Sequence, residues 1–402
     1  MILLKALKLI RVNKTRYVIC FLLLFLLFFN SSACTNNSSA AAYDEKAIAA
    51  SLESNDPDIE KKVDELIKAQ PEFYPFSGAI LMAKDGRVLL SKGYGRVHNA
   101  LPELNSPKTV YQISMITMYL TAAAIMQLQE NGKLDLNDKV SKYLPDYPNS
   151  DKFTIHQLLN HVSGLPDAIS GISAKNGYSK TVEGLIKLNT VDKLLFEPGE
   201  NFNYTFINYY LLGCIIEKVS GMCYRDYMDK CIFKSLNMSS TEVFMFRSDK
   251  LTIARGHLQE GKFHDFVPQA YYNHHAANSI FSTVEDLYRL DRALYTEKLL
   301  KKASIDAMHT PYIKYDRSSN NDWVCFDEAE MLPFRSYGYG AALNEFNGYK
   351  AVVCEGVEAG FRAVMIRFIE EDSVIIILAN NFETPLVRGN SIEKLTDIMF
   401  DE

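Results

Sequence analysis

Hydrophobic residues follow two different periods along this chain, and each period is confined to particular stretches. Toward the start, "FSGAILMAKDGRVLLSKGYGRV" (residues 76–97) holds two apolar runs around Asp85-Gly86, which is a strong hairpin signal. Toward the end, short β-branched runs occur in "YKAVVCE", "GFRAVMIRF" and "SVIIILAN" (residues 349–380). These patterns predict strands near both ends of the chain.

The middle of the chain follows the helical period instead. Apolar residues recur at helical spacing from about Met115 to Glu130, and the pattern stops at Asn131-Gly132, a good helix end. Further helical segments predicted from the pattern are residues 43–70, "TIHQLLNHVSGLP", "NYYLLGCIIEKVSGMCYRDYMDKCIF", "STVEDLYRLDRALYTEKLL" with a Ser-x-x-Glu capping box, and "SIEKLTDIMF". We therefore predict an α/β (α+β) fold, in which an antiparallel sheet formed from the N- and C-terminal parts is flanked by helices. A mostly helical lobe, about residues 115–240, is inserted in it.

The first 33 residues differ from the rest in charge and hydropathy. Five Lys and Arg residues precede the apolar run "YVICFLLLFLLFF". This run is too short, and its flanking charge too one-sided, for an ordinary membrane-spanning helix. We interpret residues 1–33 as the signal peptide of an exported protein.

The signal ends in "NSSAC", where small residues stand directly before Cys34. This resembles the lipobox of bacterial lipoproteins, although Ser31 stands where that pattern usually has leucine. The resemblance implies that Cys34 carries a lipid, that residues 34–43 form a flexible tether, and that residues 44–402 form the folded domain. We expect a chain that is exported and lipid-anchored in the bacterial cell envelope, at the outer membrane because Thr35 is not acidic.

Composition and net charge limit the kinds of molecule that this chain can bind. The 402 residues are 48% hydrophobic and 23% charged, as in an ordinary globular protein. The net charge is −6, and removal of the basic signal makes the mature chain more negative still. This argues against nucleic-acid binding, which needs a basic surface. No motif predicts a cofactor, and His274-His275 lack the spacing of a metal site.

Several ordered blocks of sequence then point to one family. They are "TVYQI", "LTAAAIMQLQENGKLDLNDKVSKYLPD", "TIHQLLNHVSGLP", "PGENFNYTFINYYLLGCIIEKVSG", "FSTVEDLYRL", "YGYG" and "GVEAGFRAVMIRF". In this order and spacing they resemble the serine β-lactamase and D-alanyl-D-alanine peptidase superfamily, in its class C β-lactamase-like branch of penicillin-binding-protein-like serine hydrolases. The likeness covers roughly residues 75 to 385.

The first family motif is a serine nucleophile with a lysine three residues later on the same helix face. Alignment of "TVYQI" and "LTAAAI" places these positions at Met115 and Met118, and a thioether can do neither job. Ser114 lies one position early, which turns it about 100° around the helix. It has Thr117, rather than lysine, three residues on.

The other two motifs are also degenerate. The tyrosine and asparagine of the second motif fall on Tyr204-Thr205-Phe206, so the tyrosine is kept and the amide is lost. Tyr204 is either a hydrogen-bond donor in a pocket or part of an aromatic cluster in "FNYTF". The Lys/His, small residue and Gly of the third motif fall on Cys354-Glu355-Gly356, so the cation has become a cysteine with a carboxylate beside it.

We therefore expect a catalytically inactive member of the family, because nucleophile, base, orienting amide and cation are lost together. Its cleft would bind a peptidoglycan-peptide-like or other small ligand, or a partner, through Met115, Met118, Tyr204, Phe206, Cys354 and Glu355. The alternative is an active hydrolase of the β-lactamase, esterase or D-Ala peptidase type that uses Cys354 or Ser114. Residues 316–333 are either a lid or a long loop, and the sequence predicts no oligomeric state.

Overall fold

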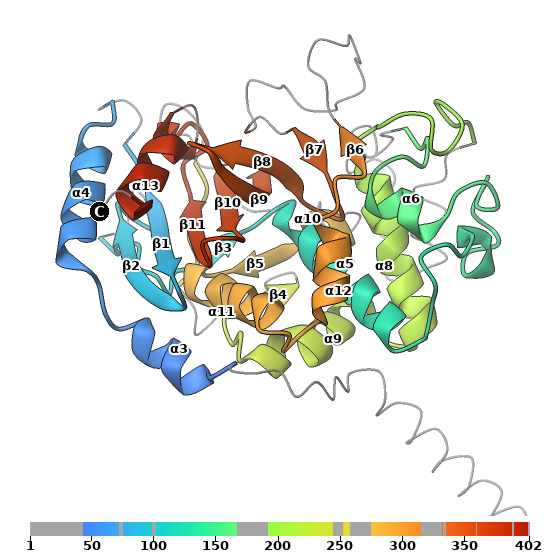
Figure 1. Ribbon diagram of the computed structural model, residues 1–402, viewed down its shortest axis with the longest axis horizontal. Coiled ribbons are helices and arrows are strands. Elements are labelled where there is room, and N and C mark those ends of the chain that lie inside the picture. Colours follow the sequence, from blue (N-terminus) through green and yellow to red (C-terminus); the bar gives the residue numbers. More distant parts are fainter. Residues whose placement is uncertain are drawn as a thin grey trace, which may run out of the picture. The chain divides into compact units, whose positions relative to one another are not determined.

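An antiparallel sheet made by both ends of the chain organises the structure, a computed structural model (Figure 1). The model describes residues 43–71, 75–98, 102–166, 192–243, 252–257, 275–314, 332, 335–358, 360–387 and 390–400. The predicted signal peptide, Cys34 and all of the predicted tether except Tyr43 lie outside these residues. The stretch 316–333 also lies outside them, apart from Leu332.

The described strands of the main sheet run in the order β2-β1-β11-β10-β9-β8-β7-β6, and every neighbouring pair is antiparallel. Their bounds are β1 (Gly78–Lys84), β2 (Arg87–Tyr94), β6 (Ile313–Lys314), β7 (Ser336–Tyr337), β8 (Ala342–Phe346), β9 (Tyr349–Glu358), β10 (Phe361–Phe368) and β11 (Ser373–Ala379). Since β1 pairs directly with β11, the prediction of one sheet assembled from both ends is confirmed.

The turn between β1 and β2 shows why the sequence signal was strong. Asp85 and Gly86 have φ angles of 51° and 73°, the left-handed values that a two-residue hairpin turn requires. A second, small sheet was not predicted. It has the order β3 (Tyr111–Gln112), β5 (Ile280–Ser282) and β4 (Glu242–Val243), strands too short to show a period of two.

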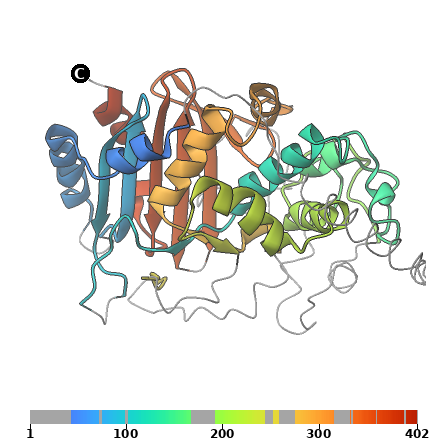
Figure 2. The same cartoon turned by 90° about the horizontal axis from the view of Figure 1, so that it is seen from below.

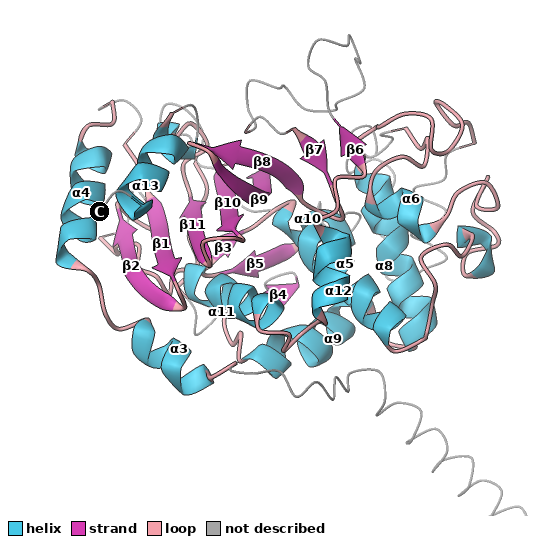
Figure 3. Cartoon of the chain, in the orientation of Figure 1, coloured by secondary structure: helices cyan, strands magenta, loops and turns pink. Residues whose placement is uncertain are grey.

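Helices fill the predicted lobe and flank the sheet (Figure 3). The α-helices are α3 (Glu45–Ser51), α4 (Pro57–Lys68), α5 (Ile116–Glu130), α6 (Ile155–Leu159), α8 (Phe206–Ser220), α9 (Tyr224–Tyr227), α10 (His275–Asn278), α11 (Val284–Tyr295), α12 (Lys302–Met308) and α13 (Ser391–Phe400). Shorter helical pieces are η1 (Val140–Lys142), the π-helical η4 (Met228–Phe233), η5 (Lys234–Leu236) and η9 (Pro385–Val387). Within the described ranges, no helix has both the length and the apolar character needed to cross a bilayer.

Local capping explains where the helices begin and end. Asp56 accepts hydrogen bonds from two backbone N–H groups at the start of α4, with Pro57 in the first turn. The end predicted at Asn131-Gly132 is confirmed, because Asn131 caps α5. The predicted Ser-x-x-Glu box is wrong by one residue: Thr283 caps α11, while the Ser282 hydroxyl lies 2.8 Å from that of Thr241.

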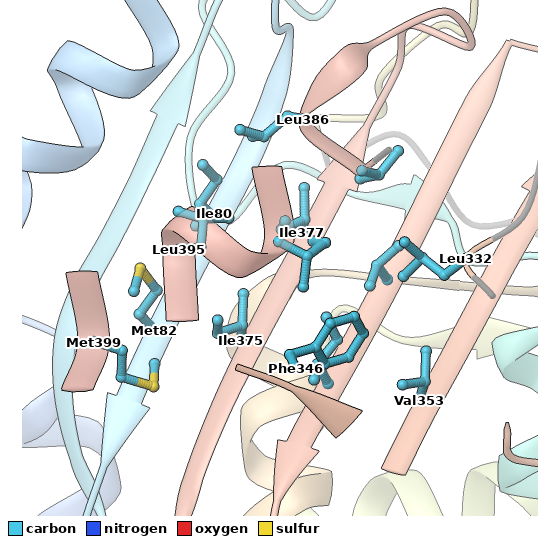
Figure 4. Packing of buried hydrophobic residues seen from close by; sticks show 14 of the residues in the cluster. Ile80, Met82, Leu332, Phe346, Val353, Ile375, Ile377, Leu386, Leu395 and Met399 are labelled. Carbon is cyan, nitrogen blue, oxygen red and sulfur yellow. The ribbon is translucent and has the colours of Figure 1, made fainter. Parts of the chain in front are cut away.

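One face of the sheet packs against α4 and α13. Figure 4 shows part of this core, in which Ile80 and Met82 of β1 and Ile375 and Ile377 of β11 meet Leu395 of α13. All five are fully buried. Full burial of such a side chain stabilises the fold by about 1.5–3 kcal/mol.

The opposite face contacts α11, which lies across the strands in Figure 2. Arg367 of β10 pairs there with Asp291 of α11 at 3.0 Å, and the two side chains are only 3% and 0% exposed. Arg367 also pairs with Asp372 and lies 4.0 Å from the ring centre of Tyr295. A buried ion pair of this kind fixes the position of the helix on the sheet.

We predict that Asp291→Ala lowers the free energy of unfolding by about 3 kcal/mol, because it removes the buried partner of Arg367 and leaves this cation with the half-exposed Asp372 carboxylate. Urea unfolding at pH 7 measures the change. Asp306→Ala is the matched control, since it removes a carboxylate from the exposed pair with Lys302 and should cost under about 1 kcal/mol. Equal effects of the two substitutions would contradict this role of the buried pair.

Candidate functional site

The start of α5 holds Met115 and Met118, the two positions that the sequence resemblance assigns to the family's nucleophile and base. Ile113 donates its N–H to the Ile280 carbonyl at 3.0 Å, which ties this segment to β5. Ser114 then takes a left-handed φ of 49°, and Met115 is the N-cap of α5. A non-glycine residue in this conformation is strained, and such strain concentrates at functional sites.

Met115 and Met118 are packed as core residues. Their side chains are 2% and 0% exposed, and nearly all of α5 is buried on every side. The Tyr204 hydroxyl donates a hydrogen bond to the Met118 sulfur at 3.2 Å. The two positions that the resemblance assigns to the family tyrosine and lysine therefore do meet, and the hydrogen-bond acceptor between them is a weak thioether.

Tyr204 is held by the loop that leads into α8. Thr205 caps α8 by accepting the Ile207 N–H, and Phe206, at the lost amide position, is the half-buried first residue of the helix. His161 stacks on the Tyr204 ring with centroids 4.4 Å apart. The loop is therefore held in place by the helix cap at Thr205 and by the stacking of His161 on Tyr204.

His161 itself is a neutral, buried group. The backbone N–H of Thr205 donates to its Nδ1 at 3.3 Å, and the Asn208 amide lies 3.0 Å from the same nitrogen. Because Nδ1 is an acceptor, the neutral ring carries its proton on Nε2. Burial lowers the pKa of His161 to about 3, so the ring carries no charge at neutral pH.

Three further aromatic rings complete this cluster. Tyr337 of β7 lies with its ring centre 5.3 Å from His161, 6.0 Å from Tyr204 and 5.6 Å from Phe202. Tyr209 of α8 lies 5.2 Å from His161 and donates its hydroxyl to the Leu159 carbonyl. These contacts agree with the reading of Tyr204 as part of an aromatic cluster.

Cys354 and Gly356 approach this region from β9. Cys354 is 3% exposed, and burial raises the pKa of its thiol well above its usual range. Burial raises the pKa of the Tyr337 hydroxyl, with smaller electrostatic contributions from Tyr204, Tyr209 and Cys354. A Cβ atom added to Gly356 would lie 2.2 Å from the Ile113 carbonyl oxygen and 3.0 Å from the Ser114 Cβ, so no larger residue fits.

The expectation that Glu355 lines the same cleft is wrong. Successive side chains of a strand point to opposite faces, so Glu355 lies on the face away from Cys354, with Val353 in the core under α13. It accepts the Leu332 N–H at 2.7 Å and pairs with the buried Arg362 at 3.4 Å. The carboxylate therefore balances a buried cation rather than a ligand.

Within the part of the chain that the structure describes, neither alternative nucleophile has a neighbouring base that would activate it. Ser114 is fully buried, and its hydroxyl has no hydrogen-bond partner among the described residues. The side chain three residues on, Thr117, accepts the Ile280 N–H at 3.1 Å. The high pKa of Cys354 keeps its thiol protonated, and a protonated thiol is a poor nucleophile.

His161, Tyr337 and Phe202 were not predicted as site residues. His161 belongs to "LLNHVSGLP" and Tyr337 to "YGYG", two of the blocks that carry the family resemblance. Membership in these blocks was the sequence feature that could have indicated His161 and Tyr337 as site residues. Their spatial meeting follows only from the packing of β7 against the loops before α8.

Comparisons with known proteins agree with this fold. A family model described as Beta-lactamase matches residues 63–395. Penicillin-binding protein 4* of Bacillus subtilis is 28% identical over 85% of this chain and 76% of its own length. An octameric penicillin-binding protein homologue from Pyrococcus abyssi is 29% identical with a TM-score of 0.66, and covers 80% of this chain and 72% of its own. D-amino acid amidase from Ochrobactrum anthropi SV3 is 19% identical, with a TM-score of 0.71. The match covers 86% of this chain and 99% of the amidase.

We predict that His161 makes stability depend on pH. Its folded pKa of about 3 lies below the ordinary 6.5, so between these values the unfolded chain binds a proton that the folded chain does not. The contribution of the neutral His161 to the free energy of unfolding is fully present above pH 6.5. It is lost as the pH falls toward 3, and the loss is about 2 kcal/mol between pH 7 and pH 5. Urea unfolding at both pH values should show this extra loss in the natural protein and not in His161→Gln. The same loss in both proteins would contradict the prediction.

Proposed function

Because the chain belongs to the β-lactamase family of serine hydrolases, we propose that it is a non-catalytic member, exported and held at the membrane by a lipid on Cys34. The observation that carries the proposal is the hydrogen bond from Tyr204 to the Met118 sulfur. At that place the family mechanism needs a basic amine. The tyrosine proton here meets a group that cannot accept it in a reaction.

The loss of chemistry is complete rather than partial. Acyl transfer by the family mechanism needs a nucleophile, a base to deprotonate it and a fixed charge to orient the substrate. Met115, Met118 and Cys354 occupy those three places, and all are at most 3% exposed. Residues that act as one unit do not lose activity gradually, so their joint replacement supports an inactive site.

The features of Ser114 and Cys354 support the same conclusion. Ser114 has a strained backbone, but its hydroxyl is enclosed and no base lies at the helical spacing that the motif uses. Cys354 is held as a buried thiol. An active hydrolase built on either residue would first have to open the packing around it.

A binding role for this site would be restricted to uncharged groups. The third-motif cation that would meet a carboxylate is replaced by Cys354, and Phe206 replaces the amide that would orient a peptide. Phe206 is half-buried, whereas Met115 and Met118 are covered. A ligand would therefore contact the exposed part of Phe206. A peptidoglycan-like peptide would bind there without a cation to hold its carboxylate.

We expect no covalent adduct when the full natural chain is incubated with a penicillin and a fluorophosphonate, because the described residues at the assigned motif positions include no activated nucleophile. Intact-protein mass spectrometry measures this directly. Penicillin-binding protein 4* of Bacillus subtilis, named for binding penicillin, serves as the positive control. An adduct on the natural chain would refute inactivity, and peptide mapping would show whether Ser114, Cys354 or another residue is modified.

The matched variant restores the four lost groups as Met115→Ser, Met118→Lys, Phe206→Asn and Cys354→His. We expect the penicillin or the fluorophosphonate to label this variant. A second variant, with Met115→Ala in place of Met115→Ser, should not be labelled. Together these two results would confirm that these positions are the family motif. Circular dichroism of both variants checks that they are folded.

The lipid anchor is tested separately. Cells that express the full chain are grown with labelled palmitate, and we expect the label on the mature protein in the membrane fraction. Cys34→Ala should remove the label, because the thiol of Cys34 is the proposed point of attachment. Equal labelling of the natural chain and of Cys34→Ala would contradict the anchor.

A further inference from the structure

A cavity of about 350 Å³ lies on the sheet, away from the family motif positions. It is lined by residues of β7, β8 and β9 and by His309 and Pro311, which follow α12. None of Met115, Met118 or Cys354 lines it. Its volume falls at the lower end of the range for small-molecule sites, which suits a small ligand better than a protein partner.

Neighbouring strands build the floor of this cavity. Leu343 of β8 is the cross-strand partner of Val352 of β9, and Glu345 is the partner of Lys350. Cross-strand partners lie on the same face, so these four side chains form one surface. By the register of β10 with β9, this is the face that carries Arg367, with Ile369 two residues further along.

The floor is apolar and partly open to solvent. Val352 is only 2% exposed, so the exposed apolar surface comes from its neighbour Leu343 and from Pro311 and Ile369, which also line the cavity. Ile369 is 44% exposed, one of few large hydrophobic residues at the described surface with such exposure. An apolar group laid on this floor would remove exposed hydrocarbon from water, which is favourable.

The rim is positively charged. Among the described lining residues, Arg335 and Lys350 stand with one carboxylate, Glu345, which pairs with Arg335 at 2.9 Å. Lys350 pairs with Glu370, which lies outside the lining, at 3.1 Å. The lining residues therefore carry a net positive charge in a chain whose net charge is −6.

These rim pairs can change partner at little cost. The Arg335 and Lys350 side chains are 66% and 75% exposed, and ion pairs of such exposure contribute at most about 1 kcal/mol. His309 adds no charge at neutral pH, because burial lowers its pKa to about 4. Its Nε2 lies 2.9 Å from the Tyr119 hydroxyl, which fixes the inner wall on α5.

We propose that this cavity binds a small amphipathic carboxylate, whose hydrocarbon chain lies on Leu343, Pro311 and Ile369 and whose carboxylate binds at Arg335 and Lys350. The proposal is independent of whether the family motif positions are catalytic. The ligand class follows from two properties of the lining residues, which are their positive charge and their exposed apolar area.

The test is a titration of the full chain in lipid nanodiscs with straight-chain carboxylates from butanoate to octanoate, with empty nanodiscs as the blank. Methyl-labelled isoleucine, leucine and methionine report the site by NMR. We expect shifts at Ile369 and Leu343 and not at Met115 or Met118. Affinity should rise about fourfold for each CH₂ group that becomes buried.

Two variants separate the parts of the proposal. Lys350→Gln should weaken octanoate binding about two- to fivefold and leave octanol binding unchanged, because only the carboxylate uses the cation. Lys302→Gln, equally exposed but outside the lining, is the matched control and should change neither. Leu343→Trp should abolish binding by filling the cavity.

Several results would overturn the proposal. They are no shift at Ile369 and Leu343, an affinity independent of chain length, octanol binding as tight as octanoate binding, or shifts confined to Met115 and Met118. The last result would instead place the ligand at the family motif positions.

Discussion

The close approach of β9 to the start of α5 is the constraint on which the rest of the site depends. Gly356 lies so near the Ile113 carbonyl that no side chain fits between them. This contact joins the sheet, built from both ends of the chain, to the helical lobe built from its middle. It also brings Cys354 to the aromatic residues that surround Tyr204. This approach brings together the positions that the sequence resemblance assigns to the family motifs, which hold Met115, Met118 and Cys354 in this chain.

The side chains at these assigned motif positions are closely packed. A serine hydrolase site of this family holds charged and polar groups that need hydrogen bonds and solvent. Here a sulfur, a hydroxyl and stacked rings fill the corresponding volume, and His161 stays neutral within it. Such a site gains stability from dispersion and apolar burial. The same packing excludes water, so any reaction or ligand at Met118 would require the cluster of Tyr204 and His161 to separate.

Much of the fold could be predicted because its signals are local. Asp85-Gly86 gives a hairpin through its own φ angles, and Asn131 ends α5 where the apolar period stops. The second sheet could not be predicted, because two- and three-residue strands carry no period. The order of the motif blocks predicts the site positions, but it does not predict the aromatic cluster, since His161 and Tyr337 meet only in three dimensions. The error on Glu355 was avoidable, because alternation along β9 already places it opposite Cys354.

A single substitution at Met118 tests whether packing has replaced chemistry. Met118→Lys restores the family residue alone, and if the position is closed core it buries an unpaired charge. We expect urea unfolding at pH 7 to show a loss of about 3–5 kcal/mol, against under about 1 kcal/mol for Met222→Lys at a half-buried position. A Met118→Lys protein as stable as the natural one would contradict this account, because it would mean that the site still accommodates a solvated amine.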